Sequence, residues 1–144
     1  MSIEQGVEAY LRFYETMSPE SLADLDSLVT PDVHFVDPFN DVRGPDAMRR
    51  IFLHMFKTVR GSRFFVTYRA QDGNVLLVRW RFTGQVDVLG KEPWVVERVS
   101  EIHVDSDGRV ARHLDHWDAA SQFYERLPLI GPIFRLIRRR AGSR

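Results

Sequence analysis

The chain has 144 residues, 44% of them hydrophobic and 28% charged, a composition that excludes a disordered protein and leaves room for one ordinary domain. It contains no cysteine, which excludes disulfides and thiolate metal sites and fits a reducing compartment. The formal charge is zero, but five of the 20 basic residues lie in residues 135–144, so residues 1–134 carry 15 bases against 20 acids, a balance of −5. We therefore expect no nucleic-acid surface on the body of the protein.

The first residues, MSIEQGVEAYL, lack the basic and apolar regions of a secretion signal, and no apolar stretch has the length of a membrane span. We expect a cytoplasmic protein. The arginine-rich tail, residues 135–144, could contact a membrane or RNA. A solvated terminal helix is the simpler expectation, because short basic runs are common and weakly specific.

Helical periodicity dominates the first third of the chain. Residues 2–17 begin with a capping-box pair, Ser2 and Gln5, and repeat apolar residues at helical spacing. A second helix is expected to begin at Ser18-Pro19 and to end before Pro31, since the residue before a proline is pushed out of the helical region.

A short strand, DVHFVDP, is predicted next, and Gly44-Pro45 then opens a third helix with a wide apolar stripe through Val59. From Phe64 to Trp117 a period of two takes over in four segments, FFVTYRA, NVLLVRWRFTG, WVVERVSEIHV and RVARHLDHW. Each of the two predicted hairpins has an Asp-Gly turn. A last short helix is expected after Asp118.

This order, helices first and hairpins after, predicts an α+β domain with helices on one face of a mostly antiparallel sheet. We expect three or four helices and a bent sheet of four to six strands.

The alternation of strand faces indicates where the acids point. Asp37 shares a face with Val33 and Phe35, so it should look inward into an apolar setting suited to a general base. In the late hairpin, pairing Asp105 with Gly108 across the turn would place Arg98 opposite Asp115.

The same register would place Ser100 opposite His113, on the face that also carries Trp94 and Trp117. Tryptophans and aliphatic residues around a few convergent polar groups are typical of a small-molecule pocket. The alternative is a structural ion pair between Arg98 and Asp115.

The opposite face of this hairpin mixes apolar and paired charged residues, which predicts a homodimer interface. Its members are Glu97, Val99, Glu101, Arg112, Leu114 and His116.

His113 and Asp115 have the spacing of an iron site with histidine and carboxylate ligands, which would need a second histidine nearby. His103 points to the other face, and nothing brings His34 or His54 to the site. We expect no metal and no cofactor.

The order of elements, the stretch FVDPFNDVRG before a helix and the strand GRVARHLDHWD resemble the SnoaL-like branch of the nuclear transport factor 2-like superfamily. That superfamily includes ketosteroid isomerases, limonene epoxide hydrolases, scytalone dehydratases and polyketide cyclases. The resemblance implies a cone-shaped α+β barrel, in which a curved sheet wraps around N-terminal helices and encloses a deep apolar pocket. It implies one domain over residues 1–134, followed by the basic tail, residues 135–144.

Asp37 matches the place of the catalytic base of the ketosteroid isomerases. Ser100 stands where those enzymes have a neutral aspartic acid, and Phe13 where they have a tyrosine on the first helix, so the oxyanion hole for steroid isomerisation is missing. Tyr10 or Tyr14 could replace that tyrosine only with a shift.

Asp115 matches the aspartate that acts on the epoxide in the epoxide hydrolases. Arg79 approximately matches the neighbouring arginine of those enzymes, but their second aspartate falls at Arg81. The trio that activates water is therefore incomplete.

The sequence thus predicts a dimeric, cofactor-independent acid–base enzyme for a small apolar molecule, of the isomerase, dehydratase, cyclase or hydrolase type. Asp37 would be the base, Asp115 a second acid or base, Arg98 its electrostatic partner and His113 a hydrogen-bond donor. The residues expected to line the pocket are Tyr14, Phe56, Trp80, Trp94, Ser100 and Trp117. The alternatives are a non-catalytic ligand-binding or dimeric interaction module, and a structural dimer whose tail docks on a membrane or another protein.

Overall fold

The computed structural model describes residues 1–143. Two longer helices cover the sheet, α1 (Ile3–Glu15) and α3 (Pro45–Thr58), with the 3-10 helix η1 (Glu20–Asp24) and α2 (Leu25–Leu28) between them. The predicted capping box is confirmed, because the Gln5 N–H donates to Ser2 Oγ and the Ser2 N–H donates to the Gln5 side chain.

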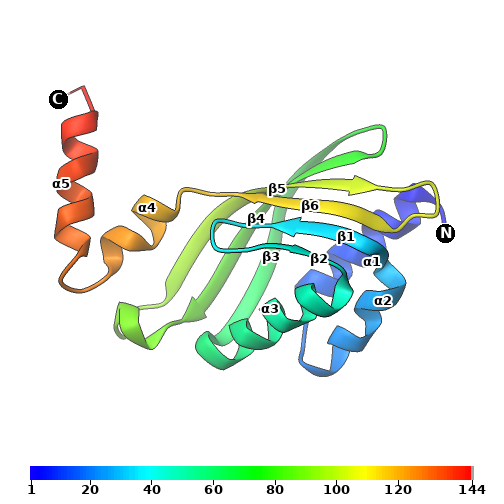
Figure 1. The fold of residues 1–144 in the computed structure, drawn as a ribbon, viewed down its shortest axis with the longest axis horizontal. Helices are drawn as coiled ribbons and strands as arrows, with labels where there is room; N and C mark the ends of the chain where they lie inside the picture. Colours follow the sequence, from blue (N-terminus) through cyan, green and yellow to red (C-terminus); the bar gives the residue numbers. More distant parts are fainter. Residues whose placement is uncertain (144) are drawn as a thin grey trace.

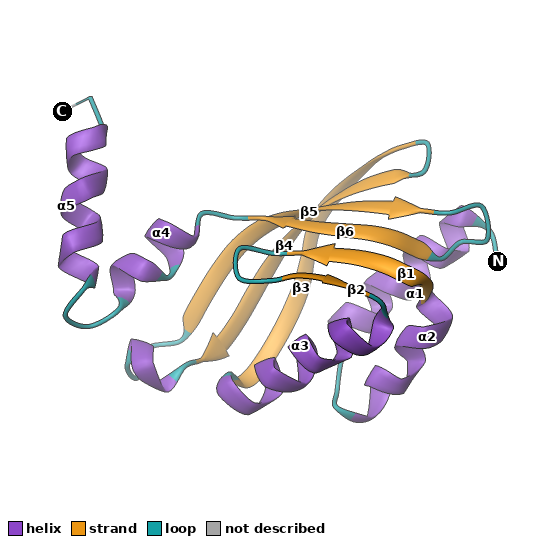
Figure 2. Cartoon of the chain, viewed as in Figure 1, coloured by secondary structure: helices purple, strands orange, loops and turns teal. Residues whose placement is uncertain are grey.

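One curved sheet of six strands wraps around α1, α2 and α3 (Figures 1 and 2). Its strands are β1 (Val29–Val36), β2 (Asp41–Arg43), β3 (Arg60–Asp72), β4 (Val75–Gln85), β5 (Trp94–Val104) and β6 (Val110–His116). They lie in the order β2-β1-β6-β5-β4-β3, so the sheet is open, with β2 and β3 at its edges. The only parallel pair in the described chain is β1 with β6, and the predicted α+β class and both hairpins are confirmed.

The chain after Trp117 forms an arm that the sequence did not predict in full. It contains α4 (Ala119–Gln122), the 3-10 helix η3 (Tyr124–Arg126) and α5 (Gly131–Ala141). Asp118 caps α4 as predicted, since its carboxylate accepts from the Ala120 N–H. Residues 1–143 therefore hold five α-helices rather than three or four, and the basic segment from residue 135 is the second half of α5.

The register of the β5–β6 hairpin differs from the prediction. Ser100, not Arg98, pairs with Asp115, and Ile102, not Ser100, pairs with His113. At the turn the Asp105 N–H donates to the Arg109 carbonyl oxygen, one residue beyond Gly108, and the Asp105 carboxylate accepts from the N–H groups of Asp107 and Arg109. A register shift between His103 and Val104 adds the second residue of displacement. Because the ladder is displaced by two residues at these positions, Arg98, Ser100, His113 and Asp115 still lie on the face that was predicted for them.

The long edge strand β3 is irregular. Its pairing with β4 shifts between Arg60 and Arg63 and again between Val66 and Tyr68. Charged side chains of α1 reach this edge, since Glu8 pairs with Arg69 and the Glu15 carboxylate accepts from the Val66 N–H at 3.4 Å.

The core lies between the concave face of the sheet and the three helices. Tyr10 and Tyr14 of α1, Met48 of α3 and Trp80 of β4 are among its fully buried side chains. In residues 1–143 no helix is long and apolar enough to cross a membrane.

Two glycines let the start of α1 approach the β5–β6 turn. A Cβ at Gly6 would lie 1.8 Å from the Gly108 carbonyl oxygen. Alanine in place of glycine normally stabilises a helix interior by about 0.5–1 kcal/mol. Here we expect Gly6→Ala to lower the free energy of unfolding by about 1–3 kcal/mol, because backbone on both sides must move.

Urea unfolding of the Gly6→Ala variant measures this effect. Ala9→Gly, on the same helix, is the reference variant. It should lower the free energy of unfolding by about 1 kcal/mol, the ordinary cost of glycine in a helix. A Gly6→Ala protein that is more stable than wild type would contradict the close approach.

Candidate active site

A cavity of about 460 Å³ opens between the concave face of the sheet and α3. Much of its wall is aromatic, and includes Phe35, Phe52, Phe64, Phe82, Trp94 and Trp117. A few polar side chains interrupt this wall. The volume and the mixture are typical of a site for a small organic molecule.

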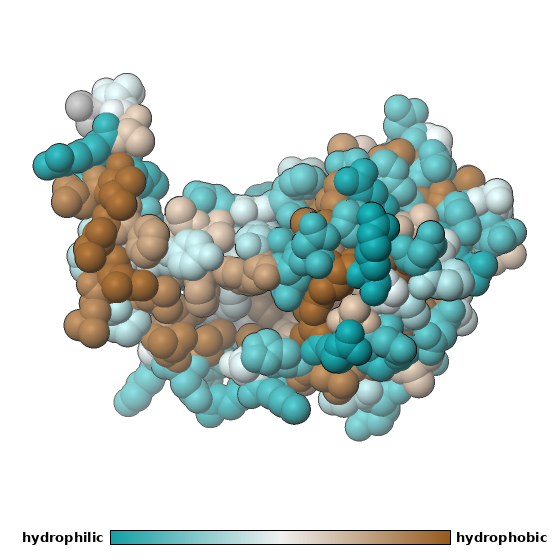
Figure 3. Space-filling model, in the orientation of Figure 1, coloured by the Kyte–Doolittle hydropathy of each residue, from teal (hydrophilic) through white to brown (hydrophobic). Residues whose placement is uncertain are grey.

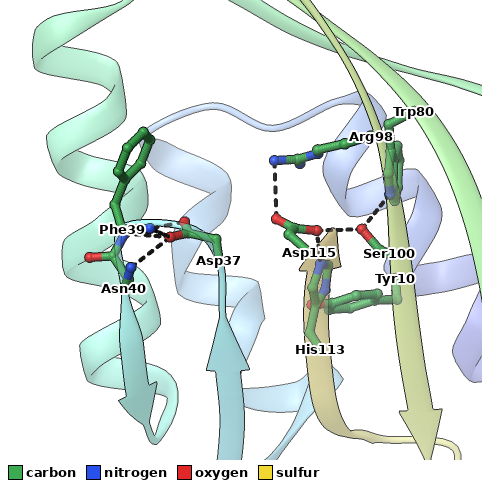
Figure 4. A network of polar contacts seen from close by, with 9 residues as sticks. All are labelled: Tyr10, Asp37, Phe39, Asn40, Trp80, Arg98, Ser100, His113 and Asp115. Atoms are coloured by element: carbon green, nitrogen blue, oxygen red, sulfur yellow. Dashed lines mark hydrogen bonds and ion pairs between the residues drawn. The ribbon is translucent and has the colours of Figure 1, made fainter. Parts of the chain in front are cut away.

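Six of the ten predicted site residues line this cavity. They are Tyr14, Asp37, Trp94, Arg98, Asp115 and Trp117. Both carboxylates lie at this cavity because of the parallel pair of strands. Val36 of β1 pairs with Leu114 of β6, and the next residues along the two chains are Asp37 and Asp115 (Figure 4).

The other four predicted residues do not line it. Trp80, Ser100 and His113 are fully buried behind the cavity wall, where no ligand would touch them. Phe56 points elsewhere from α3 and lines a separate cavity of about 180 Å³ together with residues of α1 and β3.

The buried residues instead hold Asp115 in place (Figure 4). Its Oδ1 accepts from the Ser100 hydroxyl and lies 2.8 Å from His113 Nε2. The Trp80 indole N–H donates to Ser100 Oγ at 2.8 Å, and Tyr10 Oη lies 2.8 Å from His113 Nδ1. One tautomer satisfies both histidine contacts: Nε2–H donates to Asp115, and Nδ1 accepts from the Tyr10 hydroxyl.

Arg98 is the ionic partner of Asp115, although the two residues are not directly opposite each other. Its Nη1 lies 3.1 Å from Asp115 Oδ2, and its guanidinium lies 4.9 Å from the centre of the Phe64 ring. Arg98 Nε has no hydrogen-bond partner among the described residues. The Arg98 side chain is 13% exposed against 1% for Asp115, so the arginine is the more accessible member of the pair.

Burial by itself would raise the pKa of Asp115. The charge of Arg98 and the contacts with His113 and Ser100 outweigh that effect, so the pKa of this carboxyl lies well below its ordinary value. Asp115 is therefore ionised at neutral pH. A carboxylate held in this way is a weak proton acceptor.

Asp37 occupies a different environment from the apolar one predicted. It is only partly buried, and its Oδ1 accepts from the N–H groups of Phe39 and Asn40, both at 2.7 Å. The Asn40 side-chain amide reaches both carboxylate oxygens, at 3.0 Å and 3.1 Å. These contacts orient the carboxylate at the cavity, and they leave Oδ2 with acceptor capacity.

Sequence reasoning missed several residues that line the cavity, among them Phe39, Asn40, His54 and Phe123. The first two follow Asp37 in the turn Asp-Pro-Phe-Asn, whose composition is itself a turn signal. His54 faces the cavity from α3, where its helical position gave no such indication. No cluster of three or more side chains suited to a metal occurs within residues 1–143.

The approximate match of Arg79 to the epoxide hydrolase arginine is wrong in position. Arg79 and Arg81 lie on the outer face of the sheet, where both contact Glu97, at 3.6 Å and 2.8 Å. Arg98 is the arginine that accompanies Asp115 in the cavity.

Comparison with known families identifies the family to which the chain is related. The family model of the SnoaL-like domain matches residues 10–113, more than half of the chain. The chain belongs to the SnoaL-like family. No curated protein matches this SnoaL-like sequence.

Solved structures share the fold of this SnoaL-like protein. A protein from Catenulispora acidiphila with a ketosteroid isomerase-like fold, solved in complex with trimethylamine, is 13% identical with a TM-score of 0.68, covering 81% of this chain and 88% of its own. TsrD from Streptomyces laurentii is 22% identical with a TM-score of 0.67, covering 88% and 94%. An epoxide hydrolase of the LEH-like type from M. tuberculosis is 20% identical with a TM-score of 0.67, covering 94% and 96%. At these identities the likeness shows the fold alone.

Proposed function

We propose that this SnoaL-like protein is a cofactor-independent acid–base enzyme that acts on a small, mostly apolar molecule. One observation carries the proposal: Asp37 and the ion pair of Arg98 with Asp115 face the same aromatic cavity. The fold it shares with an epoxide hydrolase of the LEH-like type is compatible with such chemistry.

Asp37 would be the general base. Its Oδ2 would take a proton from a substrate carbon, from a hydroxyl group or from a water molecule, and would return that proton to the product. The backbone N–H groups that hold Oδ1 keep the carboxylate from turning away from the cavity.

Arg98 would stabilise the negative charge that develops on a substrate oxygen, because its cationic side chain lines the cavity and retains exposure there. Asp115 would hold the guanidinium in place rather than exchange protons, and Ser100 and His113 would in turn position Asp115. Proton removal with stabilisation of an oxyanion serves an isomerase, a dehydratase or a cyclase; activation of water in the same place serves a hydrolase.

A panel of small apolar ketones and epoxides tests the proposal. We expect at least one ketone to exchange its α-protons with deuterated solvent, or one epoxide to be hydrated, at a saturable rate that depends on the protein. Trp94 and Trp117 line the cavity, so their fluorescence reports binding independently. Ligands that bind without any turnover would identify a non-catalytic binding module instead.

We also propose that the outer face of the sheet forms a homodimer. Leu77, Val95 and Val99 are 47%, 38% and 38% exposed there, beside the charged contacts around Glu97 and Glu101. Light scattering at tens of micromolar, roughly the range in which weak dimers dissociate, should give a dimer. Val99→Asp should give a monomer, whereas Val88→Asp, at an exposed site off the sheet, should not.

A further inference from the structure

One side of the terminal helix α5 is fixed to η3, the preceding element of the same arm. The Arg135 guanidinium donates to the Glu125 carbonyl oxygen, and the Arg138 guanidinium pairs with the Glu125 carboxylate. The Phe134 ring stacks on Tyr124 with a centroid distance of 5.3 Å. These contacts orient the helix relative to η3, so its opposite side faces away from η3.

The opposite side of α5 is apolar and exposed (Figure 3). It continues into the preceding turn, and its members are Leu129, Ile130, Ile133, Leu136 and Ile137. Their exposed fractions run from 45% for Ile130 to 92% for Leu129. A single exposed leucine needs no explanation, but five such residues on this helix and the turn before it mark an interaction surface.

Positive charge accompanies this apolar surface. Arg139 and Arg140 are exposed at its C-terminal end, and no acidic residue follows Glu125 in the sequence. A short amphipathic helix with arginines beside an apolar side is suited to the boundary between lipid headgroups and acyl chains. Anionic headgroups supply the charge that complements the arginines.

The position of the helix favours a lipid surface over a second copy of the chain. The arm carries α5 away from the sheet (Figure 1). Residues 1–134 have a charge balance of −5. With α5 on an anionic surface, the arm would hold this negatively charged body away from that surface, which weakens the repulsion between them. We propose that α5 binds the surface of anionic membranes, with the apolar side buried and Arg139 and Arg140 among the headgroups.

Sedimentation with vesicles tests this proposal on the full chain. We expect the protein to pellet with vesicles that mix phosphatidylglycerol with phosphatidylcholine and to remain soluble with phosphatidylcholine alone. Each arginine near an anionic surface contributes roughly five-fold to binding, so Arg139→Glu with Arg140→Glu should weaken it by more than about 25-fold. Ile133→Ser with Ile137→Ser should weaken it as well.

Matched variants on α3 test whether binding requires the surface of α5 or depends only on net charge and general hydrophobicity. Arg50→Glu with Lys57→Glu makes the same change of charge, and Leu53→Ser removes one exposed apolar side chain; both should bind like wild type. Circular dichroism and tryptophan fluorescence check that every variant is folded.

Three results would overturn the proposal. The first is failure to pellet with anionic vesicles, and the second is equal binding to neutral ones. The third is an oligomer that the Ile133→Ser and Ile137→Ser changes dissociate in light scattering, because the apolar side would then belong to a protein interface.

Discussion

Asp37→Asn should lower turnover of a panel substrate by about 10²–10⁴-fold, the usual contribution of a positioned general base. Asparagine keeps the shape of the side chain, and its oxygen can still accept from the N–H groups of Phe39 and Asn40. What it loses is the ability to take a proton. Binding, followed by tryptophan fluorescence, should therefore change far less than turnover.

Asp41→Asn is the matched control for this variant. Asp41 lies four residues further along the chain, on β2, and pairs with His34 at 2.7 Å at the surface. This change should leave turnover as in wild type. An Asp37→Asn protein that retains full turnover would remove Asp37 from the mechanism.

Arg98→Met should lower the free energy of unfolding by about 3–5 kcal/mol, because it leaves the Asp115 carboxylate buried without its cation. Asp115→Leu should cost a similar amount, since it strands Arg98 and removes the acceptor of Ser100 and His113. The double variant should recover much of the loss, because an apolar pair of similar volume carries no buried charge.

Urea unfolding of the four proteins forms a double-mutant cycle that measures the coupling directly. Single variants that each cost less than about 1 kcal/mol would show that solvent, not the partner, satisfies these charges.

The pH dependence of stability follows from the same pair. The pKa of Asp115 is lower in the folded state than in the unfolded chain, where it is about 3.9. The contribution of Asp115 is therefore present in full above that value and is lost as the pH falls through the folded pKa. We expect the stability difference between wild type and Asp115→Asn to be constant from about pH 5 to pH 8 and to shrink below about pH 4.

Strand parity allowed the inner face of the hairpin to be predicted from the sequence. Arg98, Ser100, His113 and Asp115 lie on that face even though their pairing was wrong by two residues, because an even displacement preserves parity. The register itself depends on the turn, where the Asp105 side chain accepts from backbone N–H groups, and on the shift between His103 and Val104. An Asp-Gly signal alone reveals neither.

Strand parity could not predict which residues of the inner face line the cavity and which are covered by a helix. Trp80 and Trp94 share the inner face, yet Trp94 lines the cavity while Trp80 is covered by Tyr14, with ring centroids 5.1 Å apart. Alternation reports which face a residue occupies and not which helix lies over it. The prediction from the apolar stripe of α3 has the same limitation. The stripe is so wide that Met55 lines the main cavity while Phe56 lies outside it.

The irregular edge strand β3 also affects how this protein meets other chains. A long, flat edge presents a row of free backbone groups to which a strand of another molecule can add. In β3 that row is broken by two register shifts, carries Arg60, Arg63 and Arg69, and has the Val66 N–H covered by Glu15. The longest strand of the sheet is therefore poorly suited to template intermolecular strand pairing, which protects the protein against aggregation along the edge that would otherwise be most exposed to it.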